Sequence, residues 1–295
     1  MNPRTLTGQI RSLACVLAVA IAPAPAAISA AQQEPAQQSA GDPRAQARDY
    51  LNKGVQAYKE ARFDDAIEDF KRAKELDPWL TNARLYLATA YASQYIPGAP
   101  SPSNLQNGEL AAREFKEVLE KDPNNLSAID GVGSILYKMS TSPFDPAKLM
   151  ESKSYHQRHI AIAPDDPEPY YWIGVIDWSL CYRTNRNLRD EYNRAAKFPL
   201  KENAPLTTAL AEKFAQEYGA ILEEGTAGLK NAIRLKPDYI DAMAYLNLLY
   251  RQKADMEPSA VSRDDDLRKA DELVDRVKEI RLKQMGDQSN PQTPR

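Results

Sequence analysis

Apolar and small side chains recur at helical spacing over most of the chain. Ala66, Phe70 and Ala73 follow an i, i+4, i+7 pattern, which places three side chains on one face of a helix. Four later trios repeat this pattern: Ala111, Phe115 and Val118; Ser152, His156 and His159; Gly225, Leu229 and Ala232; Ala270, Val274 and Val277. A second amphipathic segment precedes each trio, within 47–60, 81–94, 126–139, 167–180 and 240–253. The pattern predicts five pairs of helices.

Prolines mark the expected ends of the second helices. Pro78, Pro123, Pro164 and Pro237 each follow the last residue of a trio by five positions, and proline cannot continue the interior of a helix. These prolines lie 45, 41 and 73 residues apart. The repeating unit is therefore a helix pair of variable length.

The first unit resembles a tetratricopeptide repeat, a helix–turn–helix of about 34 residues. Gly54, Ala66, Phe70, Ala73 and Pro78 carry the resemblance, which extends more weakly over residues 47–283. It implies an all-α solenoid of about five helix pairs. Because the proline spacings exceed the repeat length, the surplus residues are expected between the two helices of a pair, where they lengthen loops without breaking inter-repeat packing.

The longest surplus is an insertion at 181–215. In its second half, apolar residues recur at helical spacing and predict one long helix that continues to Lys236. Thr207 or Thr208 is expected to cap this helix. This helix should be about four turns longer than a standard second helix and should project beyond the stack.

Both ends of the chain are expected outside the solenoid. Residues 1–31 have Arg4 and Arg11 before an apolar stretch that ends in small residues, the order of a cleaved signal peptide. The alternative, a membrane anchor, needs about 20 apolar residues, whereas Pro23 interrupts this stretch early. A polar leader is expected at 32–46 and a disordered tail at 284–295. The mature protein should be periplasmic or secreted.

Composition narrows the function classes. The formal net charge of −3 argues against a nucleic-acid partner. The chain has two cysteines and two histidines, and cleavage of the signal peptide would leave Cys181 as the one cysteine, so a Cys₄ or Cys₂His₂ zinc site and a disulfide framework are not expected. Phosphate-binding, dinucleotide-binding and nucleophile-elbow motifs are absent from the sequence. We expect no catalytic residue, no metal and no cofactor.

Three features leave alternatives open. His156 and His159 could serve a metal-dependent or hydrolytic enzyme, although both lie on the packing row of the repeat. Asp264, Asp265 and Asp266 fit either a cation site or a helix start, where Ser262 and Asp265 form a variant capping box. Cys181 is expected to be an inert buried thiol rather than a redox switch, since cleavage of the signal peptide leaves no partner cysteine.

The resemblance also implies a binding groove, because the first helix of each tetratricopeptide pair lines the concave face. The groove residues expected from this are Leu51, Val55, Tyr58, Leu85, Thr89, Tyr137, Tyr171, Val175, Trp178 and Leu248. Relatives that clamp a peptide carboxylate use Lys and Asn in these rows, whereas this chain has residues such as Asp130 and Ser134. A protein or peptide partner with apolar anchors is expected, unless the leader or an insertion fills the groove.

A basic segment offers a second docking element. Residues 181–201 contain Arg183, Arg186, Arg189, Arg194, Lys197 and Lys201 against only two acidic residues. This segment could dock on an acidic partner or make peripheral contact with envelope lipid, or it could fold onto the protein's own acidic surface. The sequence predicts a non-enzymatic interaction scaffold of the bacterial cell envelope, with an assembly factor that docks through 181–201 as the alternative.

Overall fold

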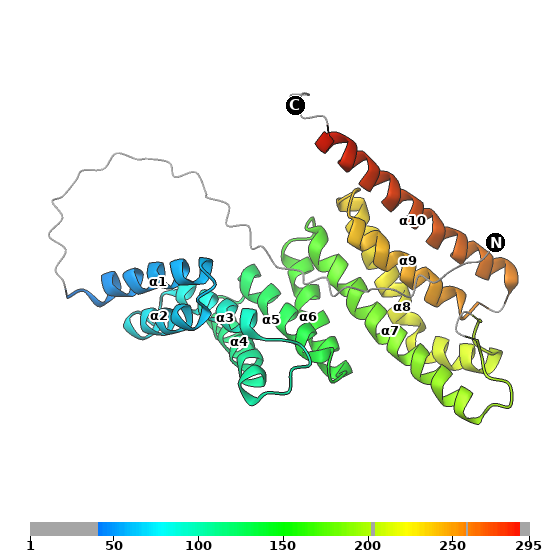
Figure 1. Cartoon of the computed structure of the whole chain (residues 1–295), viewed down its shortest axis with the longest axis horizontal. Helices are drawn as coiled ribbons and strands as arrows, with labels where there is room; N and C mark the ends of the chain where they lie inside the picture. The colour runs from blue at the N-terminus through cyan, green and yellow to red at the C-terminus, as the bar shows by residue number, and fades with distance from the viewer. Residues whose placement is uncertain (1–40, 202–203, 258, 290–295) are drawn as a thin grey trace. The chain divides into compact units, whose positions relative to one another are not determined.

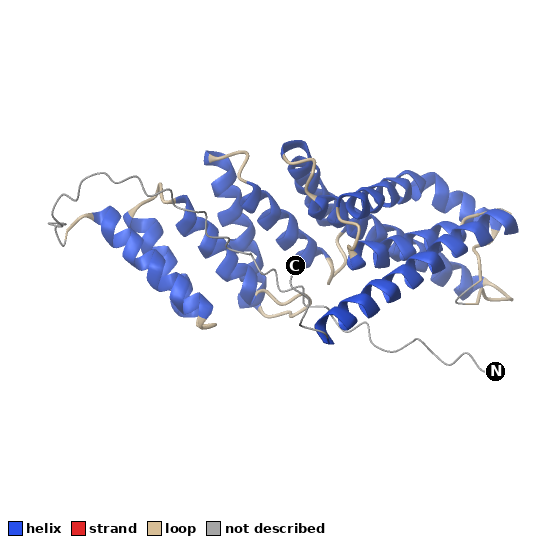
Figure 2. Ribbon diagram, turned by 90° about the horizontal axis from the view of Figure 1, so that it is seen from above, coloured by secondary structure: helices blue, strands red, loops and turns tan. Residues whose placement is uncertain are grey.

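The computed structural model describes residues 41–201, 204–257 and 259–289, and it contains helices and loops but no strand in these ranges (Figure 2). The helices are α1 (Pro43–Lys59), α2 (Phe63–Leu76), α3 (Thr81–Gln94), α4 (Pro102–Lys121), α5 (Leu126–Ser140), α6 (Pro146–Ile162), α7 (Pro167–Ala195), α8 (Thr208–Leu235), α9 (Ile240–Ala254) and α10 (Ala260–Ser289). Successive helices pack as α1/α2, α3/α4, α5/α6, α7/α8 and α9/α10 (Figure 1), and each pair also contacts the next. The predicted all-α solenoid of five helix pairs is confirmed.

Local sequence signals explain where these helices begin and end. Asp42, Ser101, Asp145 and Asp166 each accept a hydrogen bond from a backbone N–H in the first turn, and each is followed by a proline at the first helical position. Such a polar cap followed by proline favours a helix start. At the other end, α2, α4, α6 and α8 each stop two residues before one of the four prolines that mark the repeat.

Glycines allow the paired helices to approach closely. A Cβ atom on Gly54 of α1 would lie 2.5 Å from Cε1 of Phe70, the fully buried aromatic side chain of α2. Gly174 of α7 meets Leu229 of α8 in the same way. Each large side chain of a second helix therefore packs directly on the backbone of the first.

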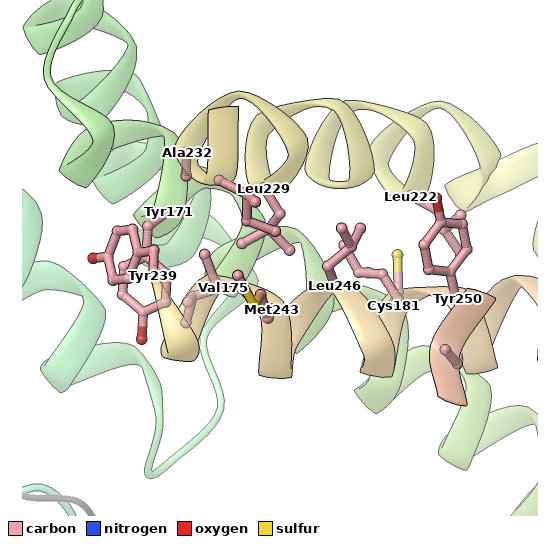
Figure 3. Packing of buried hydrophobic residues seen from close by; sticks show 14 of the residues in the cluster. Tyr171, Val175, Cys181, Leu222, Leu229, Ala232, Tyr239, Met243, Leu246 and Tyr250 are labelled. Atoms are coloured by element: carbon pink, nitrogen blue, oxygen red, sulfur yellow. The ribbon is translucent and has the colours of Figure 1, made fainter. Parts of the chain in front are cut away.

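Both halves of the long insertion at 181–215 are helical, whereas the sequence predicts a helix only in the second half. Helix α8 begins at Thr208 with Thr207 as its N-cap residue, as expected. Residues 181–195, however, continue α7 without a break. The surplus thus lengthens both helices into one hairpin, whose inner face carries Cys181, Leu222 and Leu229 (Figure 3).

Two helix boundaries and one helix cap also differ from the sequence expectation. Helix α1 begins at Pro43, so 43–46 belong to the fold rather than to the leader. Helix α10 extends to Ser289, so the tail does not begin at 284. Because α10 starts at Ala260, its first turn is capped by the Ser259 hydroxyl, which accepts from the Ser262 backbone N–H at 3.0 Å; the expected Ser262–Asp265 capping box is wrong.

The expected signal peptide, 1–31, and most of the expected leader lie outside the described residues. Within the described ranges, no helix has the length and apolar character needed to cross a membrane.

Candidate functional site

Six aromatic rings form a continuous series across α5, α7 and α9, which we call the aromatic row. Its members are, in order of contact, Tyr137, Trp172, Tyr171, Tyr245, Trp178 and Tyr182. Neighbouring ring centroids lie 5.2–5.8 Å apart, within the range of favourable aromatic pairs. Three consecutive repeats thus contribute to one series of contacting rings.

The end of the row nearest the hairpin is the most accessible. Tyr182 is 40% exposed and stacks on the partly exposed Trp178, with an interplanar angle of 18°. Leu248 of α9 is exposed to a similar extent, at 38%. Large, half-exposed aromatic side chains are typical of protein-binding surfaces.

Two residues expected in the groove are buried instead. Val175 and Tyr171 are only 1% and 7% exposed, and Figure 3 shows both among the packed side chains of α7, α8 and α9. Tyr171 contacts Tyr239, the residue that precedes α9, with ring centroids 5.1 Å apart. The expectation that Tyr171 and Val175 line an open groove is therefore wrong, because the fifth repeat covers them.

The N-terminal part of the expected groove is half-buried. Leu51, Val55 and Tyr58 pack against the core of the first two repeats, and Leu85 and Thr89 are likewise partly buried. The Tyr58 hydroxyl lies 2.8 Å from Ser93 Oγ, so it joins α1 to α3. These side chains are therefore partly used in packing between the helices.

The four arginines expected to dock a partner differ in their surroundings. Arg189 donates to Asp255 at 2.8 Å and to the carbonyl of Ala204 at 2.7 Å, so it holds the hairpin to the end of α9. Arg183 lies over the ring of Phe144, 5.1 Å from its centroid. Arg186 and Arg194 are exposed. Arg189 is therefore a structural residue, which corrects its expected role.

The histidines lie in the packing rows, as the repeat pattern indicated. His156 is buried, stacks on Trp172, and occupies the space above Gly133. Burial lowers its pKa to about 3, and neither ring nitrogen has a hydrogen-bond partner among the described residues. A neutral imidazole in this position acts as an aromatic core side chain.

His159 has carboxylate neighbours but is itself buried. Its Nδ1 lies 2.6 Å from Asp130 Oδ1 and its Nε2 lies 3.3 Å from Asp166 Oδ2. Burial raises the pKa of Asp130, and the hydrogen bond with His159 opposes that rise. The arrangement joins α5 and α6 to the turn before α7.

The remaining candidate residues, Cys181 and the acidic residues at the start of α10, are buried or form ion pairs. The Cys181 thiol is fully buried, and burial raises its pKa to about 12, which makes it a poor nucleophile. Asp265 and Asp266 pair with Lys269 along α10. Among the residues that the structure describes, no group of three or more His, Cys, Asp or Glu side chains could hold a metal ion.

Sequence reasoning missed three members of the aromatic row. Trp172, Tyr182 and Tyr245 lie outside the groove positions that the repeat resemblance marks. The spacing of Trp178 and Tyr182, i and i+4, would have placed them on one face had 181–195 been recognised as helix.

Comparison with known proteins supports the fold. A MamA double mutant, RS-1 ArsTM, is 18% identical with a TM-score of 0.54 over 84% of this chain and 100% of that chain. MamA 41-end from Desulfovibrio magneticus RS-1 gives 18% identity and a TM-score of 0.53 over 83% and 99%. A further MamA structure gives 16% identity and 0.51 over 79% and 94%. No protein-family model and no curated protein matches the chain. The likeness and the helix pairing together identify an α-solenoid of the tetratricopeptide-repeat type.

Proposed function

We propose that this protein is a protein-binding scaffold that holds a polypeptide segment against the accessible end of the aromatic row. The observation that carries the proposal is the stacked pair of Trp178 and the exposed Tyr182. Trp and Tyr offer a large, rigid contact area and lose few rotamers on binding, which is why they dominate binding energy at interfaces.

The partner is an extended peptide or an amphipathic helix with apolar anchors. An α-solenoid presents the first helices of successive repeats side by side, so one segment can contact several of them. Trp178 and Tyr182 come from α7, whereas Tyr245 and Leu248 come from α9. Apolar anchors at successive turns of a partner helix would match this spacing.

Replacing Trp178 by alanine is expected to weaken partner binding by about 2 kcal/mol, the threshold of an interface hot spot. The measurement is calorimetry with a partner that has been captured on the whole chain and then purified. Trp79 provides a matched control, because it is 77% exposed and lies in the turn between α2 and α3. Unchanged affinity in Trp178→Ala, or an equal loss in Trp79→Ala, would place the interface elsewhere.

We also propose that the scaffold works outside the cytoplasm of a bacterium, in the periplasm or after secretion. Arg4, Arg11 and the short apolar stretch after them support export. N-terminal sequencing of the protein from an envelope fraction should give a mature form that begins near Gln32. An intact Met1 on a membrane-embedded species would contradict cleavage.

A further inference from the structure

We infer that His159 is a pH-sensitive latch between the third and fourth repeats, which is closed while its imidazole carries two protons. His159 lies on α6, which contacts both α5 and α7. Two carboxylates face its ring, that of Asp130 from α5 and that of Asp166, the N-cap residue of α7. The inference goes beyond the proposed function, since it concerns the joint between two repeats and requires no partner.

The positions of the two carboxylates favour a cationic ring. Nδ1 of His159 lies 2.6 Å from Oδ1 of Asp130, a hydrogen-bond distance. Nε2 lies 3.3 Å from Oδ2 of Asp166, which is an ion-pair distance without the alignment of a hydrogen bond. A neutral imidazole has one N–H and one lone pair, so one of its nitrogens would turn a lone pair toward a carboxylate. An imidazolium has an N–H on both nitrogens and is attracted to both carboxylates.

Burial makes the protonation state of His159 matter for the joint. The side chain is 4% exposed, so water does not replace a contact that is lost. When the ring is neutral, Nδ1–H can still donate to Asp130 and hold α5 to α6. The contact between Nε2 and Asp166 is favourable only when the ring is charged. Loss of one proton therefore releases α6 from the start of α7 and leaves α5 and α6 joined.

The other titratable groups around this joint do not compete with the charge on His159. Glu168, in the first turn of α7, adds a third carboxylate, whereas Asp165 is exposed. Burial lowers the pKa of His156 to about 3, so this neighbour on α6 stays neutral. Lys153, further back on α6, pairs with Asp177 at 2.7 Å. The charges that face His159 are therefore negative.

The latch is closed over a limited pH range. Histidine gains or loses its proton between about pH 5 and pH 8, so the latch opens toward the upper end of this range. The folded protein, in which two carboxylates face the ring, favours the proton more than the unfolded chain does, so the joint loses stability as the pH rises. At the acidic end the limit is set by Asp130. Burial raises the pKa of this carboxyl, and its protonation removes one of the two negative charges.

The latch lies beside the point where the aromatic row crosses from the third repeat to the fourth. His156, one turn before His159 on α6, stacks on Trp172 of α7. Trp172 in turn contacts Tyr137 of α5, with ring centroids 5.3 Å apart. An open latch therefore loosens the interface that holds Tyr137 against Trp172.

The test is hydrogen exchange of the whole chain from about pH 5.5 to about pH 8, corrected for the intrinsic exchange rate at each pH. Asp166→Asn removes one carboxylate and keeps a side chain that caps α7. Near pH 6, protection of α6 and the first turns of α7 should be about tenfold higher in the wild type than in Asp166→Asn. Near pH 8 this ratio should fall to about one or below, because the neutral ring gains nothing from the carboxylate. Asp165→Asn, the same charge change at an exposed neighbour, is the matched control and should behave like the wild type.

The ratio between wild type and variant separates the latch from Asp177, whose pKa of about 7 adds a pH dependence common to both proteins. His159→Gln cannot take up a proton and should lose the same part of the pH dependence as Asp166→Asn. Circular dichroism confirms that each variant is folded, and Asp166→Asn decides alone if His159→Gln is not. A ratio that stays constant over the pH range, or a wild-type profile in folded His159→Gln, would overturn the inference.

Discussion

Replacing Phe70 by alanine is expected to lower the free energy of unfolding by about 3–5 kcal/mol, the usual cost of truncating a buried phenylalanine. The ring is 1% exposed and packs on the backbone of Gly54, close to the ring of Tyr86, with centroids 5.7 Å apart. It therefore connects α1 and α2 to the second repeat. Chemical denaturation monitored by circular dichroism measures the loss.

Phe198 is the matched control for this substitution. It lies in the loop after α7 with its side chain exposed, so Phe198→Ala should change stability by less than about 0.5 kcal/mol. Because each repeat of a solenoid contacts only its neighbours, hydrogen exchange in Phe70→Ala should increase first in α1–α4. A denaturation midpoint equal to that of the wild type would show that the packing face of the first repeat has been assigned wrongly.

Replacing Lys153 by methionine is expected to cost about 3–5 kcal/mol, because it leaves a buried carboxylate without its cation. Lys153 Nζ of α6 lies 2.7 Å from Asp177 Oδ1 of α7 and 2.8 Å from Glu224 Oε2 of α8. Lys153 and Asp177 are almost entirely buried, so neither can recover water contacts. One side chain thus joins three helices around the third and fourth repeats.

The loss of stability in Lys153→Met should depend on pH. Burial raises the pKa of Asp177 to about 7, which is above its value of 3.8 in the unfolded chain, and Lys153 opposes that rise. Removing Lys153 therefore raises the pKa further. A raised folded pKa means that stability is retained at acidic pH, where the carboxyl is protonated in both states, and is lost as the pH rises through the folded pKa. The deficit relative to the wild type should be small near pH 4 and largest above about pH 7.

Two variants separate this effect from a general loss of packing. Lys116→Met removes a surface ion pair with Glu151, in which Nζ and Oε1 lie 2.8 Å apart, and should cost no more than about 1 kcal/mol. The double variant Lys153→Met/Asp177→Asn should recover part of the stability, because it removes the unpaired carboxylate. Chemical denaturation of Lys153→Met, Lys116→Met and the double variant is measured across the pH range. If the stability lost in Lys153→Met did not depend on pH, Asp177 would not be the source of the loss.

Much of the fold was predictable because its determinants are local. Phe70 and Gly54 lie within one repeat unit, and their spacing marks both helices of the pair. Caps such as Asp166 before Pro167 specify helix starts within a few residues. The same signal, Asp42 before Pro43, marks the start of α1, although the polar composition around it is that of a leader.

The candidate site was less predictable because it depends on contacts between repeats. Tyr171 is buried by Tyr239 and Tyr245, which lie far along the chain and reach it only when the fifth repeat stacks on the fourth. Arg189 forms part of a charge run in the sequence, yet its partner Asp255 is 66 residues away. Neither the repeat spacing nor the charge pattern predicts these contacts between residues far apart in the sequence.

The most direct measurement of the scaffold proposal is site-specific photo-crosslinking in the native cell. A photoreactive benzoylphenylalanine is introduced in place of Tyr182, at the accessible end of the aromatic row, and in a second protein in place of Trp79, which is exposed between α2 and α3. We predict a crosslink to one polypeptide from position 182 and none to that polypeptide from position 79. A crosslink from position 79 with none from position 182 would contradict the aromatic row as the binding surface.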